Sequence, residues 1–400
     1  MAADKERLAV GVDAGSLSTR CVILQVDDGF LRYLGHGEIE SAGWSKGRLT
    51  DHLAVRHSIR AAIDRAQKIA KATVEQVVLG VGGPGIDGSN SRGLYDFGRP
   101  HRITQREILS AVEGAAKVRM EDGRMLLQLL PQDFTLDGRA GYRHPVGSRC
   151  SRLDANVYLI TTSQREHEML LTAAHESSVA VEETVFEPVA SAYAAIRPDE
   201  RSRGVALIDI GWHSTGLVVY DGDALALAKS IPVSADHFTR DVALGLKVAY
   251  EDAERLKLQY GCAMLGLTAD NSLVELPTPE GRASREAPRR VLNEILEARA
   301  EELFAFVRRE LQQIGMEQNL LDGVVLTGGG SLLNGMVEMA ERELNCPAQN
   351  GLPLGIEHWP EELNHAGWTV GAGLAMYSAM LKSKRDGGRK APGLVGLVLR

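Results

Sequence analysis

The chain has 400 residues, 44% of them hydrophobic and 24% charged, which is typical of a globular protein large enough for two or more domains. Its formal net charge of -8 provides no global basic field, which argues against nucleic acid as the main partner. Four widely spaced cysteines indicate neither a disulfide framework nor a zinc site, and no apolar stretch approaches the ~20 residues of a membrane-spanning helix.

The first predicted element is a hairpin of two strands, over residues 8–12 and 21–26, with Asp13-Ala14-Gly15 at its turn. Glycine lets the backbone approach a ligand closely, so this turn presents one carboxylate and several N–H groups at one place. A third strand is expected near residues 29–37. A helix over 51–72 and a short buried strand over 77–81 follow, and Gly-Gly-Pro-Gly ends that strand.

The composition changes between residue 82 and about residue 163. A stretch rich in Gly, Ser and Arg comes first, followed by a predicted helix over 104–118 and strands over 125–130 and 155–161. We predict a small inserted α+β subdomain here.

A second hairpin, with strands over 205–208 and 217–220, repeats the first. It follows a helix over 164–178, a strand over 181–186 and a helix opened by Glu187-Pro188. The pattern D-x-G-x-x-S-T-x-x-V occurs at both 13–22 and 209–218. One D-x-G is usually only a turn, but two matched copies facing across a cleft would hold both ends of a phosphate chain and its magnesium ion.

The remaining elements alternate between helix and strand, which predicts mixed sheets flanked by helices. Residues 234–260 are expected to be helical, 271–288 irregular because they contain three prolines, and 289–314 a long amphipathic helix. A buried strand over 323–327 then leads through a glycine loop into a helix over 332–344. Such a loop could offer N–H groups to an anion, although most are simple strand-to-helix turns.

The two hairpins resemble those of the actin/Hsp70/hexokinase ATPase superfamily. Three further motifs occur in the same order along the chain as in that superfamily, namely E-P-V-A-S-A-Y-A at 187–194, A-E-R-L-K at 253–257 and V-V-L-T-G-G-G-S at 324–331. Within it the chain most resembles FtsA, the bacterial actin homologue of cell division. L-P-Q-D-F at 130–134 and P-V-G at 145–147 carry that likeness, which covers about residues 8–381.

The resemblance implies an α/β, actin-like (ribonuclease H-like) fold of two lobes, with an SHS2-like insert and a flexible C-terminal tail. The expected division places residues 1–81 and 164–203 in the first lobe, 82–163 in the insert, 204–381 in the second lobe and 382–400 in the tail.

The resemblance also implies an ATP site. The two hairpins would bind the phosphates, and Asp13 and Asp209 would hold Mg²⁺ through water. The A-E-R-L-K helix would contact the ribose and adenine, and the glycine loop would lie behind the adenosine. The implied nucleotide-binding residues are Asp13, Gly15, Ser16, Ser18, Asp209, Gly211, Ser214, Thr215, Glu254, Lys257, Gly328, Gly329, Gly330 and Ser331.

Hydrolysis is less clearly indicated than binding. Glu187 falls where relatives orient the attacking water, so it is the catalytic candidate, but an acidic residue is also common at a helix start before proline. Glu254 and Lys257 also fit a plain exposed i, i+3 pair. Trp212 and His213 replace two glycines of the usual second hairpin, which favours ATP binding over efficient hydrolysis.

The implied function is that of an adaptor which polymerises on the cytoplasmic face of the cell membrane and anchors the FtsZ ring at midcell. The insert would contact later division proteins. Arg299 and Glu302 match the face that receives the FtsZ C-terminal peptide, although a solvated charged face is the simpler interpretation.

The tail combines basic residues within 382–390 with an apolar end, which indicates a peripheral contact with an anionic membrane. A frayed terminus is the competing interpretation. The apolar residues are Leu394, Val395, Leu397, Val398 and Leu399.

Two alternatives stay open at this point. One is a PilM-like pilus-assembly adaptor of the same fold, against which the basic and apolar tail argues. The other is a sugar or metabolite kinase, because the first hairpin also reads like that of carbohydrate kinases. The insert, which lies where FtsA has its own, argues against this kinase alternative.

Overall fold

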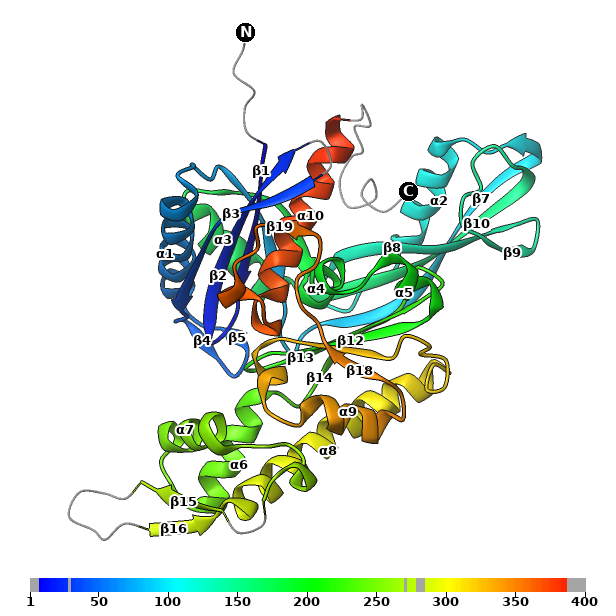
Figure 1. The fold of residues 1–400 in the computed structure, drawn as a ribbon. Helices are drawn as coiled ribbons and strands as arrows, with labels where there is room; N and C mark the ends of the chain where they lie inside the picture. The colour runs from blue at the N-terminus through cyan, green and yellow to red at the C-terminus, as the bar shows by residue number, and fades with distance from the viewer. Residues whose placement is uncertain (1–6, 28–29, 270–271, 278–284, 387–400) are drawn as a thin grey trace.

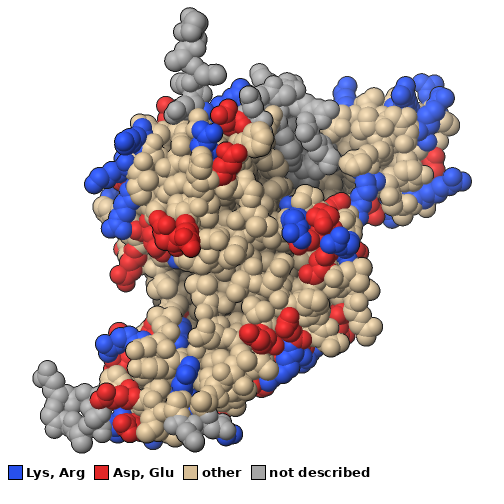
Figure 2. Space-filling view, in the orientation of Figure 1, with Lys and Arg blue, Asp and Glu red and all other residues tan. Residues whose placement is uncertain are grey.

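The computed structural model contains two large sheets flanked by helices and a third, inserted sheet (Figure 1). It describes residues 7–27, 30–269, 272–277 and 285–386. Within these ranges, no helix is long and apolar enough to cross a membrane. Lys and Arg gather over the outer end of the insert in Figure 2, whereas both signs are interspersed over the rest of that face.

The first sheet has the strand order β11-β6-β1-β2-β3-β19, and β1 pairs antiparallel with β2 but parallel with β6. Its strands are β1 (Arg7–Ala14), β2 (Ser18–Asp27), β3 (Phe30–Glu40), β6 (Gln76–Val81), β11 (Ala180–Phe186) and β19 (Ile356–Glu357). The predicted hairpin, third strand and short buried strand are therefore all present.

Helix α1 (His52–Ala70) packs on β3, and α3 (Gln164–Glu176) packs against α1. Asp51 caps α1 by accepting hydrogen bonds from the N–H groups of Leu53 and Ala54. Helix α1 and strand β3 pack closely, since a Cβ added at Gly37 on β3 would lie 2.0 Å from the carbonyl oxygen of Ala62 on α1. A small hairpin of β4 (Trp44–Ser45) and β5 (Arg48–Leu49) precedes the helix.

The second sheet has the order β14-β13-β12-β17-β18, and β12 again forms an antiparallel hairpin with β13. Its strands are β12 (Val205–Ile210), β13 (Thr215–Asp221), β14 (Ala224–Ile231), β17 (Val324–Thr327) and β18 (Ala348–Asn350). The helices of this lobe are α6 (Ala235–Leu246), α7 (Tyr250–Tyr260), α8 (Arg289–Gln313) and α9 (Met336–Leu344).

Three details of this lobe correct the sequence-based expectations. The segment 234–260 forms two helices, because Lys247 takes a left-handed conformation with a φ of 54° and ends the first. The irregular segment 271–288 contains a hairpin of β15 (Leu273–Leu276) and β16 (Arg285–Pro288). The glycine loop forms a short 3₁₀ turn (Gly329–Leu332), so the helix after it starts at Met336 instead of residue 332.

The insert is a sheet of order β7-β10-β8-β9 covered by α2 (Gln105–Ala115). Its strands are β7 (Asp87–Arg102), β8 (Arg124–Leu136), β9 (Arg139–Tyr142) and β10 (Arg149–Ser163). The long strand β7 occupies the Gly, Ser and Arg-rich stretch, where no strand was predicted. Gly93 on β7 permits the close contact with α2, since a Cβ there would lie 1.8 Å from the carbonyl oxygen of Ala111.

The last helix returns to the first lobe (Figure 1). Helix α10 (Thr369–Asp386) packs on β1 and on α4 (Glu187–Ala195), which precedes α5 (Pro198–Arg203). A Cβ added at Gly373 would lie 2.0 Å from the carbonyl oxygen of Ala190. The sequence-based division placed residues 204–381 in the second lobe, whereas β19 and α10 lie on the first sheet.

Candidate nucleotide-binding cleft

The turns of the two hairpins meet at a cavity of about 290 Å³ between the lobes. Pockets for small ligands are typically of about this size or larger. Most of the predicted nucleotide-binding residues line it, together with Glu187. These are Asp13, Gly15, Ser16, Ser18, Asp209, Gly211, Ser214, Glu254, Lys257, Gly328, Gly329 and Gly330.

The two hairpin turns have the same local geometry. A Cβ added at Gly15 would lie 2.8 Å from the carbonyl oxygen of Ser18, and one added at Gly211 would lie 2.8 Å from that of Ser214. The N–H of Gly211 donates to that Ser214 oxygen at 2.9 Å. Glycine is therefore needed at both positions for the backbone to turn this tightly, as the repeated sequence pattern indicates.

Two buried carboxylates, those of Asp13 and Asp209, meet the partly buried carboxylate of Glu187 at the junction of the hairpins. Burial is the main cause that raises the pKa of Asp13 to about 6 and that of Asp209 to about 7. Burial also raises the pKa of Glu187 well above its usual range, and the charges of Asp13 and Asp209 add to this effect.

Little positive charge offsets these carboxylates. Arg20 lowers the pKa of both aspartates, but its guanidinium also pairs with Glu38 at 2.8 Å. Thr327 donates a hydrogen bond to Asp209 at 3.1 Å. No group of three or more His, Cys, Asp or Glu residues that could hold a metal ion occurs among the described residues. Carboxylates are ligands that divalent cations such as Mg²⁺ prefer, so the chemistry of Asp13 and Asp209 fits such an ion.

The buried aspartates predict that the ligand-free protein loses stability as the pH rises from about 4 to about 7. Their folded pKa values lie above the usual 3.8, so in this window the folded state binds more protons than the unfolded state. Their stabilising contribution is complete below pH 4 and is lost as the pH rises through the folded values. We expect a decrease of up to about 7 kcal/mol in the free energy of unfolding, measured by urea denaturation, because each unit of raised pKa corresponds to about 1.4 kcal/mol.

The control for this measurement is the D13N/D209N double variant, whose profile should lack that decrease. The comparison is needed because burial lowers the pKa of several histidines, and these act in the opposite direction between pH 5 and 7. A wild-type profile that matches the double variant would contradict the prediction. The histidines are His36, His167, His213 and His365.

The wall formed by α7 is held by an internal ion pair. Lys257 is buried, its Nζ lies 2.7 Å from a carboxylate oxygen of Glu254, and it donates to the hydroxyl of Thr239 at 2.8 Å. Burial lowers the pKa of Lys257, and the nearby Glu254 opposes this. The pair is thus not the exposed i, i+3 pair that was the simpler interpretation of the sequence.

Trp212, which stands where the usual second hairpin has glycine, forms part of the cavity wall and does not simply block the cavity. It lines the cavity, and the Nζ of Lys257 lies 5.0 Å from the centroid of its ring, within the range of a cation–π contact. Tyr250 meets the same ring edge to face at 6.5 Å. His213 is not part of the lining; its Nε2 lies 4.0 Å from Asp236. Of the two large side chains in the second turn, Trp212 therefore lies along α7, and His213 lies outside the cavity wall.

Two predicted residues do not lie on the cavity wall. Thr215 is fully buried, and its hydroxyl has no hydrogen-bond partner among the described residues. The hydroxyl of Ser331 donates to the carbonyl oxygen of Gly328 at 2.8 Å, so it closes the glycine loop. Both residues therefore belong to the turns that line the cavity, but their own side chains do not form its wall.

Sequence reasoning missed several lining residues. Leu258 could have been found, because it shares the i, i+3, i+4 face of α7 with Glu254 and Lys257. Leu17, Arg20 and Leu332 are close sequence neighbours of the predicted residues, whereas most of the others come from elements that the tertiary fold brings to the cavity. Besides Leu258, the missed lining residues are Leu17, Arg20, Ala235, Phe238, Gly261, Leu332, Leu333, Asn334, Gly367 and Val370.

The predicted partner residues lie on α8, outside the cavity. The Nε of Arg299 lies 2.5 Å from a carboxylate oxygen of Asp241 on α6, and its guanidinium also pairs with Glu302. These contacts raise the pKa of Arg299 above its usual value. Arg299 therefore links α6 to α8 as well as facing solvent in part.

Each of the two lobes presents a glycine-turned hairpin with a buried aspartate to the cavity between them. This arrangement defines an actin-like protein. Residues 206–373 match the family model of cell division protein FtsA, and residues 83–161 match that of the SHS2 domain inserted in FtsA. FtsA of Pseudomonas aeruginosa is 30% identical over 382 residues, covering 95% of this chain and 91% of that protein. FtsA of Escherichia coli K12 is 30% identical over 383 residues, covering 94% and 91%. The chain belongs to the FtsA family of cell division proteins.

Solved structures confirm the fold at lower identity. The PilM–PilN complex of type IV pilus biogenesis has a TM-score of 0.68 at 17% identity, covering 93% of this chain and 98% of that one. MreB5 of Spiroplasma citri bound to ADP has a TM-score of 0.57 at 13% identity, covering 95% and 98%. The α/β actin-like fold with an SHS2 insert is thus confirmed. The family membership favours a cell-division protein over the pilus-assembly and kinase alternatives.

Proposed function

We propose that this protein binds ATP with Mg²⁺ in the interlobe cleft and acts as a membrane-bound adaptor that polymerises and anchors the FtsZ ring. The observation that carries the nucleotide proposal is the convergence of two matched glycine turns, each with a buried aspartate, on one cavity. The backbone N–H groups of both turns would bind phosphate oxygens. Asp13 and Asp209 would hold the metal through water.

The metal ion, when bound, would neutralise charge on the phosphates and on the buried carboxylates. Glu254 and Lys257 would contact the ribose, and the loop Gly328–Gly330 would face the adenosine. The glycine loop has room for this because a Cβ at Gly329 would meet nothing within 4 Å. The remaining residues of the second turn, including Trp212, would close the cleft on the α7 side.

Glu187 supports slow hydrolysis at most. A general base must be ionised to accept a proton from water, and burial raises the pKa of this carboxyl. Its side chain also packs against the backbone at Gly82, where an added Cβ would lie 2.0 Å from its Oε2. We therefore propose that ATP serves mainly to hold the two lobes in one arrangement, and that turnover is slow or absent.

Replacing Lys257 with alanine should weaken ATP binding by about tenfold, because it removes a buried cation from the cleft and leaves the Glu254 carboxylate without its ion-pair partner. The matched control is Arg255→Ala on the same helix, since that side chain is 71% exposed and lies outside the cavity lining. Isothermal titration calorimetry measures both. Equal affinities for the two variants would count against a role of the α7 wall in binding.

The partner and membrane roles follow from the family and are proposals for this chain. The FtsZ C-terminal peptide would bind on α8 at Arg299 and Glu302, and the insert would contact later division proteins and further copies of the chain. The apolar tail residues 394–399 lie outside the described residues. We propose that they bind the cytoplasmic face of the membrane at the division site, helped by the basic residues before them and by the avidity of a polymer.

Sedimentation with anionic vesicles tests the tethering proposal. The full chain should pellet with the vesicles, whereas a version that ends at Asp386, where α10 ends, should stay in solution. Mg-ATP should change the pelleted amount if nucleotide controls polymerisation. Equal pelleting of the two versions would show that the tail is not an anchor.

A further inference from the structure

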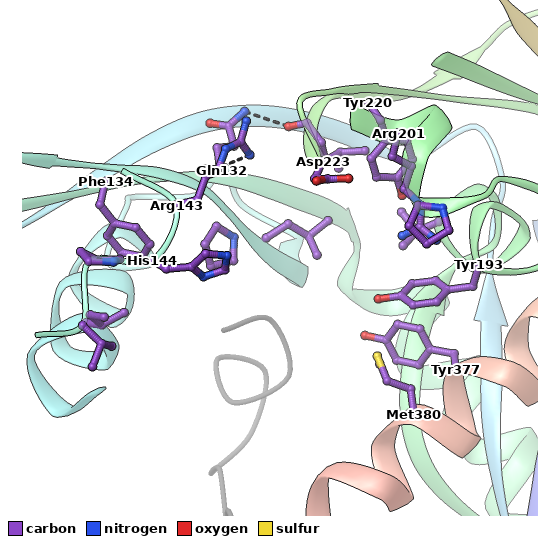
Figure 3. Close-up of a pocket in the computed structure, with 18 of the residues that line it drawn as sticks. Gln132, Phe134, Arg143, His144, Tyr193, Arg201, Tyr220, Asp223, Tyr377 and Met380 are labelled. Carbon is purple, nitrogen blue, oxygen red and sulfur yellow. Dashed lines mark hydrogen bonds between the residues drawn. The ribbon is translucent and has the colours of Figure 1, made fainter. Parts of the chain in front are cut away.

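A second and larger cavity, of about 870 Å³, lies between the insert and the two lobes, away from the nucleotide cleft. Figure 3 shows Tyr193, Tyr377 and Met380 on one side of it and Phe134 and His144 on the other. One wall thus comes from α4 and α10 of the first lobe, and the opposite wall comes from the insert.

The wall on the lobe side is aromatic and apolar. The rings of Tyr193 and Tyr377 meet edge to face at 5.2 Å, and the guanidinium of Arg201 lies 5.1 Å from the centroid of the Tyr193 ring. Met380 lies beside them in Figure 3. Across the cavity, Val146 of the insert is 53% exposed. Such a surface favours an apolar ligand with a few polar groups.

The polar group on this wall is the guanidinium of Arg201, which lines the cavity and is only partly buried. It has five N–H donors, and its hydrogen bond to the carbonyl oxygen of Ile196 at 3.4 Å does not use all of them. A ligand that brings a carbonyl oxygen can therefore accept a hydrogen bond here. A segment of polypeptide supplies carbonyl oxygens as well as apolar side chains.

The chain itself continues from the edge of this cavity. Ser383 lines it, and α10 ends three residues later at Asp386. Beyond that point the sequence has Gly387-Gly388, the basic residues Arg389 and Lys390, and the apolar residues of 394–399. A segment of this length extends up to roughly 46 Å, which is ample to reach back to the cavity. A short tether also gives an effective concentration on the order of millimolar.

We propose that residues 394–399 of the same chain dock in this cavity when the protein is off the membrane. The apolar side chains then pack on the wall of Tyr193 and Tyr377, and a backbone carbonyl oxygen accepts a hydrogen bond from the guanidinium of Arg201. The docked form hides the segment that the tethering proposal assigns to the membrane, and only that consequence rests on the proposed function.

Disulfide cross-linking of the full chain tests the docking. Val146→Cys and Leu397→Cys are combined in a C346A background, since Cys346 is half-buried and the other cysteines are buried. The control pair is Leu94→Cys with Leu397→Cys, because Leu94 is exposed on the same insert but does not line the cavity. We expect cross-linking within one chain to be at least tenfold faster for the Val146 pair. Equal rates, or links only between chains, would overturn the proposal.

A rim variant separates docking from membrane binding. Val146→Glu should release the tail, lower its protection from protease and increase pelleting with anionic vesicles several-fold over wild type. A variant with unchanged protease protection would contradict the docking. If no full-length variant binds vesicles, the tethering proposal fails, while the cross-linking rates still decide whether the tail docks.

Discussion

Replacing Asp209 with asparagine should stabilise the ligand-free protein and at the same time remove most of its affinity for Mg-ATP. Burial, and after it the charge of Asp13, raise the pKa of this carboxyl to about 7. The amide keeps the shape and carries no charge, so the free energy of unfolding at pH 8 should increase, by up to about 4 kcal/mol. Loss of the carboxylate that we propose holds the metal through water should weaken Mg-ATP binding by about 100-fold.

The two effects have opposite signs, so one thermal denaturation series measures both. At pH 8 the D209N variant should unfold at a higher temperature than wild type without ligand, and Mg-ATP should no longer shift that temperature. At pH 5 the advantage of the variant should shrink, because the wild-type carboxyl is then protonated. Asp221→Asn is the control, since Asp221 is exposed at the end of β13 in the same sheet. A D209N protein that is less stable but still responds to Mg-ATP would refute the assignment.

The sequence predicted the two hairpins because their signal is local. Apolar runs, an aspartate and a glycine occur at fixed spacing, and the glycine is required by contacts within the turn itself, at Gly15 and at Gly211. The convergence of Asp13 and Asp209 on one cavity then followed from the repeated pattern and the family resemblance. The order of most helices and strands could be predicted for the same reason.

The features that sequence reasoning missed depend on contacts distant in the chain. Strand β7 is largely polar and exposed, and its pairing with β10 defines it. The hairpin of β15 and β16 forms despite the nearby prolines, because Pro288 lies at the end of its strand. Helix α10 packs on β1, about 360 residues earlier, and no local pattern marks that contact.

The nucleotide site shows the same difference between local signals, which the sequence reveals, and contacts between distant parts of the chain, which it does not. Lys257 looked like half of an exposed helix pair, and the sequence could not show that Trp212 and Thr239 surround it. Trp212 was recognised as a departure from the glycine-rich pattern, but its effect depends on the position of α7, which the tertiary structure decides. Residues of a turn can thus be predicted from sequence, whereas the walls opposite that turn cannot.

Replacing Arg299 with alanine should weaken binding of an FtsZ C-terminal peptide by at least tenfold. The guanidinium has five N–H donors, and its contacts with Asp241 and Glu302 do not use all of them, so donors remain for a ligand. The side chain is also partly buried and held by both neighbours, which reduces the entropy lost on binding. Fluorescence anisotropy with a labelled peptide measures the affinity.

Two controls separate direct contact from a change in helix packing. Arg290→Ala removes an exposed arginine on the same helix that pairs with Glu294, and it should leave the affinity unchanged. Asp241→Asn breaks the link between α6 and α8 while keeping Arg299, so it should lower stability by about 1 kcal/mol but change the affinity less than threefold. If Asp241→Asn weakens peptide binding as much as Arg299→Ala does, Arg299 acts by holding α8 in place, and the peptide contacts other residues of this face.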